Sequence, residues 1–367
     1  MTTKARKLAD LGNQIDDGAI TGTNMVINGG MTVAQRGTQT AQTSGYTACD
    51  RWEFAENGSS VVTTTQDANI PAGEGFGSSL KVDVTNASGT PSSGNYAFLR
   101  TKFEGQDLQH IRKGTSAAKP LTLSFWVSSP KTGIHVVELY DTDNNRQVSK
   151  SYTINSVNTW QHVSVSMPAD TTGALDDDNN HSMQIAFWLM AGSNFSGGTL
   201  NTSWAANNNS NRAVGQVNCM DNTSNNFYLT GVCLNVGDSA IDFPHDESYG
   251  DTLAKCKRYF ERIGIPAGSN YQSFGVGHVH TNVTAVSVIP YEVEKRANPT
   301  ASYDTASNFA LLNAAGGAVA CTGIGTSRTS THTVSVNANA SGLVVGNATF
   351  LIANNTAKPF IDIDAEL

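Results

Sequence analysis

Two short stretches of the chain carry side chains of the types that bind metal ions. The first is His278-Val279-His280, whose two imidazoles would point to the same side of a strand. In a three-fold symmetric assembly, three such pairs would place six nitrogens around an axis, which suits an octahedral transition metal. Exposed or hydrogen-bonded histidines on a strand are the simpler interpretation. We therefore assign no metal site to the single chain.

The second stretch is Asp141-Thr142-Asp143 with Asn144 and Asn145 behind it. Oxygen ligands stand at alternating positions, as they do in calcium loops, but the glycine and the closing glutamate of such a loop are missing. A hairpin turn is the simplest interpretation, and calcium binding at Asp141 and Asp143 stays open.

A third set of residues could recognise sugar. Trp204, Asn207 and Asn208 lie in the stretch 192–226, which is rich in Asn, Ser and Gly and has little strand pattern. An aromatic ring in a polar loop offers a flat apolar face to a sugar, and neighbouring amides can bind its hydroxyls. We predict carbohydrate contact at these three residues, with a loop anchor as the alternative for Trp204.

Catalytic motifs are missing from the sequence. It contains no nucleophile elbow, no zinc-protease motif and no phosphate-binding glycine loop. The carboxylate pair of a glycosidase has no fixed spacing, and the acidic run 176–178 is typical of a solvated turn. We therefore expect neither an enzyme nor a cofactor.

The composition narrows the class of protein further. Only 15% of the 367 residues are charged, against roughly 25% in an average soluble protein. The formal net charge of −8 argues against nucleic-acid binding, which needs clustered Lys and Arg. Five scattered cysteines without a CxxC pair predict buried, reduced thiols and folding in a reducing cytoplasm. We expect no secretory signal and no insertion into a membrane, because no apolar run is long enough.

Most of the chain has the pattern of β-strands separated by turns. Between residues 23 and 240, seven stretches alternate at period two or are rich in β-formers. They predict a two-sheet β-sandwich of jelly-roll type, with Trp126, Trp160 and Trp188 packed in its core. The seven stretches are residues 61–65, 80–84, 121–127, 134–140, 163–167, 183–189 and 227–234.

One helix interrupts this pattern. The apolar residues Tyr249, Leu253, Cys256, Phe260 and Ile263 recur at intervals of four, three, four and three. That spacing predicts a helix from residue 248 to residue 263, within a connector over 241–263, and gives Leu253, Cys256 and Phe260 a structural role. A serine at 248 and an aspartate at 251 resemble a capping box. Behind the connector we predict a second, smaller β domain over 264–367, with strand-like residues at 274–293, 334–336, 343–345 and 349–352.

Several of these segments resemble parts of bacteriophage tail fibres and related virion proteins. The run 28–37 (NGGMTVAQRG), followed by 46–52 (YTACDRW), is similar to the opening of their jelly-roll domains. Residues 123–127, 160–165 and 227–232 resemble strands of sandwiches like those of carbohydrate-binding modules. The connector and residues 296–300 (RANPT) are similar to the segments that follow. At the opening, Asp50 and Arg51 could form a charge-assisted bond at a corner while Trp52 fills the core.

The resemblance implies a phage virion protein with a jelly-roll domain that binds carbohydrate. We expect a tail fibre or receptor-binding appendage that recognises a host surface glycan, exposed on the particle after synthesis in the host cytoplasm. Its partners would be its own copies, as a homotrimer, and other tail or capsid proteins, bound through the N-terminal segment 1–22. The alternatives are a capsid or tail decoration protein without a receptor role, and a polysaccharide depolymerase.

Overall fold

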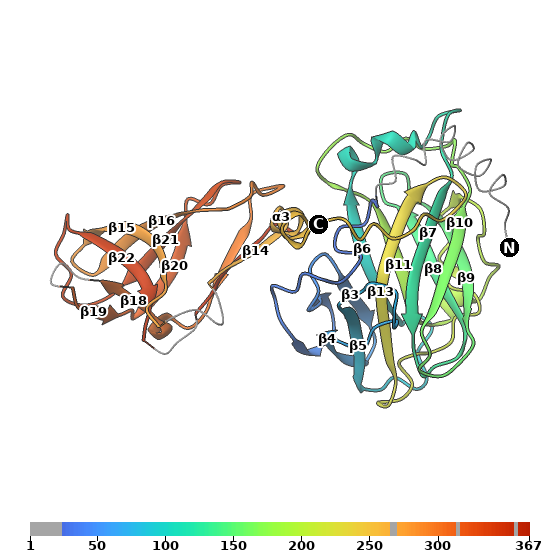
Figure 1. Cartoon of the computed structure of the whole chain (residues 1–367), viewed down its shortest axis with the longest axis horizontal. Helices are drawn as coiled ribbons and strands as arrows, with labels where there is room; N and C mark the ends of the chain where they lie inside the picture. The colour runs from blue at the N-terminus through green and yellow to red at the C-terminus, as the bar shows by residue number, and fades with distance from the viewer. Residues whose placement is uncertain (1–23, 265–269, 313–315, 356–358) are drawn as a thin grey trace. The chain divides into compact units, whose positions relative to one another are not determined.

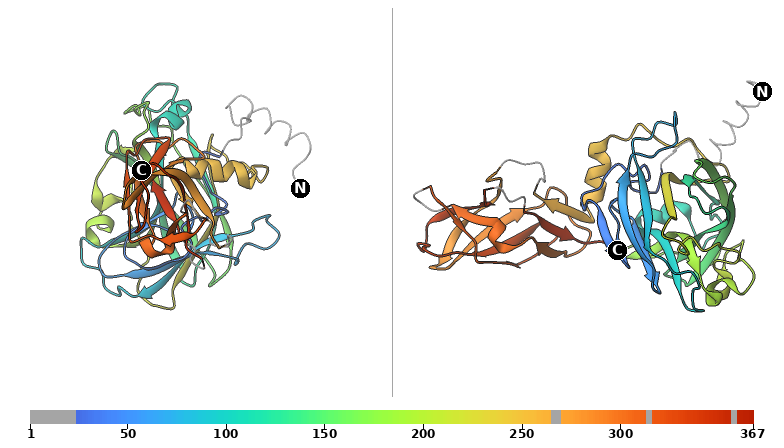
Figure 2. Two further views of the ribbon diagram at one scale, coloured as in Figure 1. Left: turned by 90° about the vertical axis from the view of Figure 1, so that its left-hand side faces the viewer. Right: turned by 90° about the horizontal axis from the view of Figure 1, so that it is seen from below.

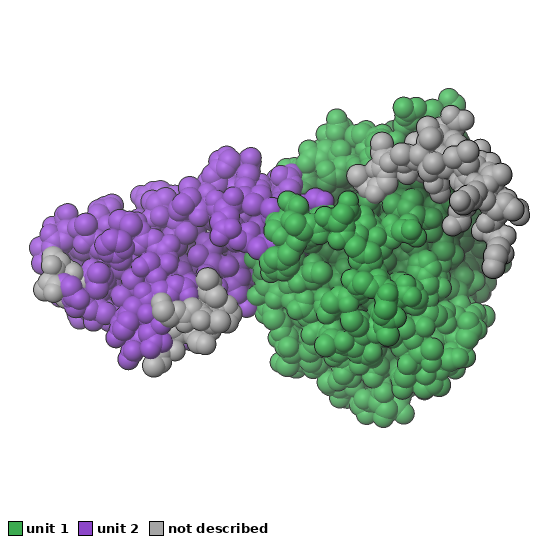
Figure 3. Space-filling model, in the orientation of Figure 1, with its two compact units in different colours: residues 1–252, 367 green, residues 253–366 purple. Residues whose placement is uncertain are grey.

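The computed structural model describes residues 24–264, 270–312, 316–355 and 359–367. The segment 1–22, for which the sequence predicts attachment to the virion, lies outside the described residues. The chain forms two compact units (Figure 3). Unit 1 extends to Thr252 and includes Leu367, and unit 2 comprises Leu253–Glu366.

Unit 1 is a sandwich of two antiparallel sheets (Figure 1). One sheet has six strands in the spatial order β1-β4-β5-β13-β7-β10, and the other has seven in the order β12-β9-β8-β11-β6-β3-β2. The strands are β1 (Gln39–Gln42), β2 (Gly45–Tyr46), β3 (Glu53–Asn57), β4 (Val61–Asp67), β5 (Ser79–Asn86), β6 (Tyr96–Glu104), β7 (Leu121–Ser128), β8 (Gly133–Asp141), β9 (Arg146–Ile154), β10 (Gln161–Met167), β11 (His181–Ala191), β12 (Ala205–Ala206) and β13 (Asn226–Val236).

The chain passes repeatedly from one sheet to the other, for example from β5 to β6, from β6 to β7 and from β7 to β8. This crossing confirms the predicted jelly-roll type of sandwich. All seven predicted strand stretches coincide with observed strands. The sheets meet through alternate side chains, and Phe125 of β7 packs edge-to-face on Phe187 of β11 with 4.9 Å between ring centroids. Each such ring contributes roughly 2–3 kcal/mol by leaving water.

Short helical turns connect some of these strands. They are η2 (Gly105–Ile111), α2 (Ser193–Ser196) and η3 (Asn209–Asn211). No helix in the described part of the chain has the length and apolar character needed to span a bilayer. Both units consist almost entirely of strands and loops (Figure 2).

The tryptophans divide between the core and the surface of unit 1. Trp52 and Trp188 are fully buried, which confirms core packing for both. The prediction is wrong for Trp126 and Trp160, which are only partly buried. Successive side chains on a strand point to opposite faces, so Phe125 in the core turns its neighbour Trp126 outward.

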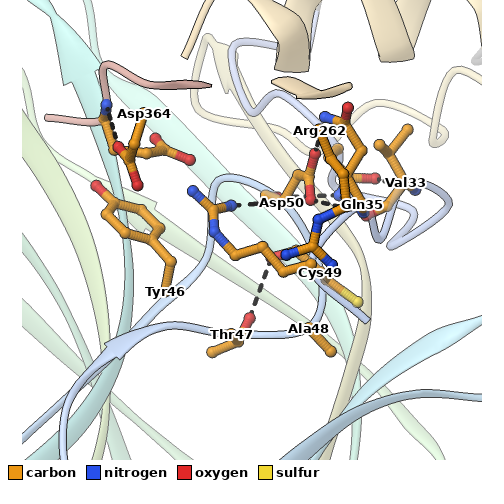
Figure 4. A network of polar contacts seen from close by, with 12 residues as sticks. Val33, Gln35, Tyr46, Thr47, Ala48, Cys49, Asp50, Arg262 and Asp364 are labelled. Atoms are coloured by element: carbon orange, nitrogen blue, oxygen red, sulfur yellow. Dashed lines mark hydrogen bonds and ion pairs between the residues drawn. The ribbon is translucent and has the colours of Figure 1, made fainter. Parts of the chain in front are cut away.

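The corner before Trp52 is fixed by hydrogen bonds around the buried carboxylate of Asp50 (Figure 4). This carboxylate accepts a bond from the Gln35 amide N–H at 3.0 Å and another from the Gln35 side chain. The Arg51 guanidinium donates to the Lys102 carbonyl at 2.7 Å, while its own backbone has φ 72°. Asp50 and Arg51 thus both form hydrogen bonds at the corner, and the Trp52 indole fills the core as predicted.

All five cysteines are free and buried, as predicted. Burial raises the pKa of the Cys233 and Cys321 thiols to about 12. At neutral pH these thiols stay protonated and serve as small apolar side chains.

Unit 2 contains two antiparallel sheets around its own core. A three-stranded sheet has the order β14-β23-β17, and a seven-stranded sheet has the order β19-β18-β22-β15-β16-β21-β20. The elements are α3 (Tyr249–Lys257), within which the two units divide, β14 (Phe260–Ile263), β15 (Ser273–Thr281), β16 (Thr284–Pro290), β17 (Thr300–Tyr303), η4 (Ala306–Asn308), β18 (Phe309–Leu312), β19 (Ala318–Ala320), β20 (Gly323–Ser327), β21 (Thr333–Asn339), β22 (Ala348–Ala353) and β23 (Ile361–Asp364).

The predicted helix over 248–263 is too long. It begins as expected, with the Ser248 hydroxyl accepting from the Asp251 amide at 3.2 Å, but α3 ends at Lys257. Residues 260–263 form β14 and pair with β23, and Arg262 makes two bonds to the carboxylate of its cross-strand partner Asp362. Strand pairing with a segment about 100 residues away therefore overrides the helical spacing.

The three residues for which the sequence predicts a structural role lie on α3 and β14 and differ in burial. Cys256 on α3 and Phe260 on β14 are buried, and Leu253 on α3 is half-buried. Tyr249, the first residue of the predicted apolar stripe, is 60% exposed. The predicted strand over 343–345 is also wrong: these residues form a loop and a turn, and their two valines are largely exposed.

Candidate functional site

The outer face of the six-stranded sheet in unit 1 carries a group of aromatic side chains. Trp126 of β7 lies directly across from His162 of β10 in the strand register, and their rings are 5.3 Å apart. Both side chains point away from the sandwich core, because their neighbours Phe125 and Val163 point into it. Trp126 and His162 form the floor of a hollow of about 410 Å³.

The wall of this hollow comes from two loops. Phe76 lies between β4 and β5, and Phe243 and His245 follow β13. The three rings contact one another, with centroid distances of 5.1 Å from Phe76 to Phe243, 4.8 Å from Phe76 to His245 and 5.1 Å from Phe243 to His245. We call the hollow bounded by Trp126, His162, Phe76, Phe243 and His245 the aromatic groove.

A glycine allows the wall to approach the floor. Gly231 lies where the register of β13 against β7 shifts, and its φ is 61°. A Cβ at this position would stand 2.5 Å from the Phe76 ring and 3.1 Å from the Trp126 ring. Glycine is required here both by the left-handed backbone and by the close contact of the two rings.

A second, smaller hollow of about 170 Å³ adjoins the same wall. It shares Phe76, Phe243 and His245 with the aromatic groove, so these three residues line both hollows. Its remaining lining is mainly backbone and uncharged polar side chains, with the carboxylate of Glu247 as the exception. Those residues include Asn24, Asn28, Thr32, Tyr249 and Thr252.

The charge of the groove is negative. Glu74 and Asp242 line it, and neither Lys nor Arg does so in the described residues. Burial lowers the pKa of His162, while the fields of Glu74 and Asp242 act in the opposite direction. At neutral pH, His162 is therefore uncharged and can donate or accept a hydrogen bond.

More aromatic side chains extend along the same face of the sheet. The Trp160 ring lies 6.1 Å from that of Tyr228 on β13, and its indole N–H donates to the Asn69 side chain at 3.2 Å. Lys81 of β5 lies over the Tyr228 ring at 5.9 Å. Together with the groove, these side chains make an outward face that combines flat apolar rings with hydroxyl, amide and carboxylate groups.

The sugar site predicted from the sequence does not lie in this groove. The Trp204 indole N–H donates to the Pro168 carbonyl at 2.9 Å, the ring packs against the core of unit 1, and the Lys113 ammonium lies 5.0 Å from its centroid. The Asn208 side chain accepts bonds from Ser210 and caps η3. These contacts favour the loop anchor for Trp204. Sugar contact at Trp204, Asn207 and Asn208 stays a prediction.

The two sequence stretches with metal-binding residue types have different surroundings. His278 and His280 are both exposed on β15, with ring centroids 6.0 Å apart. In the described part of the chain no group of three or more potential metal ligands of the His, Cys, Asp and Glu types occurs. The expected pairing of the two imidazoles on one side of a strand is thus present, and a metal shared between copies stays a prediction.

The Asp141 stretch forms the hairpin turn between β8 and β9, as the simpler interpretation predicts. The Asp141 carboxylate is buried and pairs with the Lys113 ammonium. That ammonium also lies 3.0 Å from Asp170 and donates to the carbonyls of Thr172 at 3.1 Å and Gly173 at 2.9 Å. Two carboxylates and two carbonyls thus surround a lysine in an arrangement of oxygens that would also suit a hard cation.

Comparison with known proteins finds distant likenesses. No family model matches the chain, and no curated protein matches it in sequence. The enzymatically active domain of tailspike protein 4 of bacteriophage CBA120 is similar to 58% of this chain at 15% identity, with a TM-score of 0.32. This likeness spans about a fifth of the tailspike chain, 21% of its length.

Smaller sugar-binding structures are matched over nearly their whole length. A family 11 carbohydrate-binding module of a Clostridium thermocellum cellulase is similar to 55% of this chain and covered to 95%, at 12% identity and a TM-score of 0.27. A putative sugar-binding protein from Bacteroides thetaiotaomicron is similar to 58% of this chain and covered completely, at 11% identity and a TM-score of 0.29. Likeness at this level carries no argument about function.

Proposed function

We propose that this chain is a non-enzymatic glycan-binding protein and that the aromatic groove of unit 1 holds the saccharide. The observation that carries the proposal is the outward position of Trp126 opposite the wall of Phe76, Phe243 and His245. Sugar rings have apolar faces of C–H groups, which pack on flat aromatic rings and release water. The surrounding polar groups can then bind the hydroxyls and fix the orientation.

The shape of the site supports a chain of sugars rather than a single one. The same three rings line both hollows, and Trp160 and Tyr228 continue the aromatic face of the sheet. An extended ligand could pack on several rings in succession, so that individually weak contacts add up.

The test is binding of oligosaccharides and polysaccharides to the full chain, measured by calorimetry or affinity electrophoresis. Trp126→Ala should weaken binding by about 2 kcal/mol or more, roughly 30-fold, because it removes the central ring of the floor. Trp204→Phe is the matched control and should bind like the unaltered chain. Loss of binding in Trp204→Phe but not in Trp126→Ala, with both variants folded, would refute the groove and favour the site predicted from the sequence.

We further propose that the protein serves on a phage particle as a tail fibre or receptor-binding appendage, assembled as a homotrimer and attached through residues 1–22. This part rests on the resemblance of the opening segment and the connector, and on the surface rich in hydroxyls and amides. Antibody labelling of particles in the electron microscope should mark the tip of a fibre. Labelling over the capsid or along the tail would identify a decoration protein instead.

We also propose that the protein does not cleave the polysaccharide that it binds. Incubating the protein with a polysaccharide that it binds should leave the chain length of the polysaccharide unchanged. Shortened chains would refute this and identify a depolymerase.

A further inference from the structure

The aromatic groove combines two features that together select a charge on the ligand. Rings of Trp126, Phe76 and Phe243 line it, and so do the carboxylates of Glu74 and Asp242. The face of an aromatic ring attracts a cation through its quadrupole, and a carboxylate attracts it directly. Rings and carboxylates around one hollow are the elements of a site for an ammonium group.

Within the part of the chain that the structure describes, neither attraction is already satisfied. Both carboxylates are exposed, and in the described residues neither has a hydrogen-bond or ion-pair partner, although both act on the charge of His162. Elsewhere in unit 1 the cations of the protein do cover aromatic rings, for example Lys113 over Trp204 and Arg212 over Trp188. No cation in the described part of the chain lies over Trp126, Phe76 or Phe243.

We infer that the aromatic groove prefers saccharides that carry a free amine, such as glucosamine-type polymers, over N-acetylated and anionic saccharides. This inference rests on the proposed glycan-binding function. The sugar ring packs on Trp126, and its ammonium lies between the aromatic wall and the carboxylates of Glu74 and Asp242. An N-acetyl group removes the positive charge. A uronic acid places a negative charge beside two carboxylates, where repulsion opposes binding.

The experiment compares the affinities of the full chain for three tetrasaccharides, which are built of glucosamine, N-acetylglucosamine and galacturonate, α- or β-linked. Binding is measured at neutral pH and low salt. A glucosamine tetramer with trimethylated amines serves as a permanently charged probe, whose charge does not depend on the buffer. We expect the two cationic tetramers to bind roughly tenfold more tightly than the N-acetylated one, and the galacturonate tetramer to bind most weakly. Added salt should reduce these differences.

Two variants separate charge from shape. The isosteric double variant Glu74→Gln with Asp242→Asn should lose most of the preference, so that the ratio of its affinities for the cationic and the N-acetylated tetramers falls toward one. The double variant Asp176→Asn with Asp177→Asn removes the same total charge outside the groove and should keep the preference. Equal loss in both double variants would mean a general effect of net charge and would overturn the inference.

The measurements distinguish a groove without the charge preference from a groove that binds no glycan. If the N-acetylated or anionic tetramer binds as tightly as the cationic ones, and Trp126→Ala weakens that binding, the groove binds glycans without the preference inferred. If no saccharide binds, or Trp126→Ala leaves binding unchanged, the proposed function of the groove itself is wrong.

Discussion

Replacing Lys113 by methionine should destabilise unit 1 more than any surface substitution. The side chain is 3% exposed, and its ammonium contacts the carboxylates of Asp141 and Asp170 and two backbone carbonyls. Methionine preserves much of the apolar stem that passes Trp204 but removes the charge. The buried oxygens around it then lose their common donor.

The expected loss of unfolding free energy depends on which other groups compensate the charges of the two carboxylates. Burial alone would raise the pKa of Asp170, but its hydrogen bonds from Arg146 and Lys113 lower it below the ordinary value. In the variant, the Arg146 guanidinium still donates two hydrogen bonds to the Asp170 carboxylate, at 2.8 Å and 2.9 Å. Asp141 is fully buried, and among the described residues it then keeps only the neutral side-chain amide and backbone N–H of Asn144 as donors. Leaving one buried carboxylate without its cation costs about 3–5 kcal/mol.

The assay is urea unfolding of the full chain, followed by the fluorescence of the buried tryptophans of unit 1. Lys113→Met should lower the unfolding free energy by about 3–5 kcal/mol, whereas Lys119→Met, a nearby lysine with no ion pair in the described residues, should change it by less than about 0.5 kcal/mol. Adding Asp141→Asn to Lys113→Met should recover part of the loss, because the uncompensated charge is gone. A single Lys113→Met variant within about 1 kcal/mol of the unaltered chain would refute this reasoning.

Four further outcomes follow from the same structure. Lys113→Ala leaves two carboxylates and two carbonyls around an open space, so millimolar calcium should raise the midpoint of thermal unfolding of this variant and leave that of the unaltered chain in place. His135 is fully buried and burial lowers its pKa to about 4, so the unfolded state binds more protons below about pH 6.5. His135 alone should contribute a fall of roughly 3 kcal/mol in the unfolding free energy of unit 1 between pH 6.5 and pH 4, and His135→Gln should remove this share of the pH dependence. Gly231→Ala should force the Phe76 and Trp126 rings apart and weaken glycan binding at least tenfold in calorimetry, while the sandwich still folds by circular dichroism. Phe260→Ala should lower the stability of unit 2 by about 3–5 kcal/mol in urea, since the side chain is 2% exposed, and a near-neutral result would show that β14 is peripheral.

The strands of unit 1 are the part of the structure that the sequence predicts best. Stretches such as 121–127 and 183–189 alternate or are rich in β-formers, and each becomes a strand because one side of it must be buried. The sequence pattern does not predict β6, which mixes charged and apolar residues, although this strand lies inside its sheet between β11 and β3. The pairing partners of a strand come from elsewhere in the chain, and its local sequence does not specify them.

The local sequence also indicates that one aromatic ring of β7 must face outward. Phe125 and Trp126 are adjacent on a strand pattern, so both cannot point into the same core. Which of the two faces outward depends on which sheet covers β7, and that is decided only when β11 packs on it. The loop position of Trp204, by contrast, gave no indication that Lys113 and Pro168 would hold it.

The sequence by itself determined that this protein is mainly β, that its thiols are buried and that a helix begins near residue 248. Those features depend on side-chain periodicity, apolar character and a local cap, which act over a few residues. Only the tertiary structure decided where the helix ends, because β14 pairs with β23, and which aromatic rings meet. The groove joins Phe76, Trp126, His162 and Phe243 from four separate segments, and Gly231 makes the close approach of Phe76 and Trp126 sterically possible.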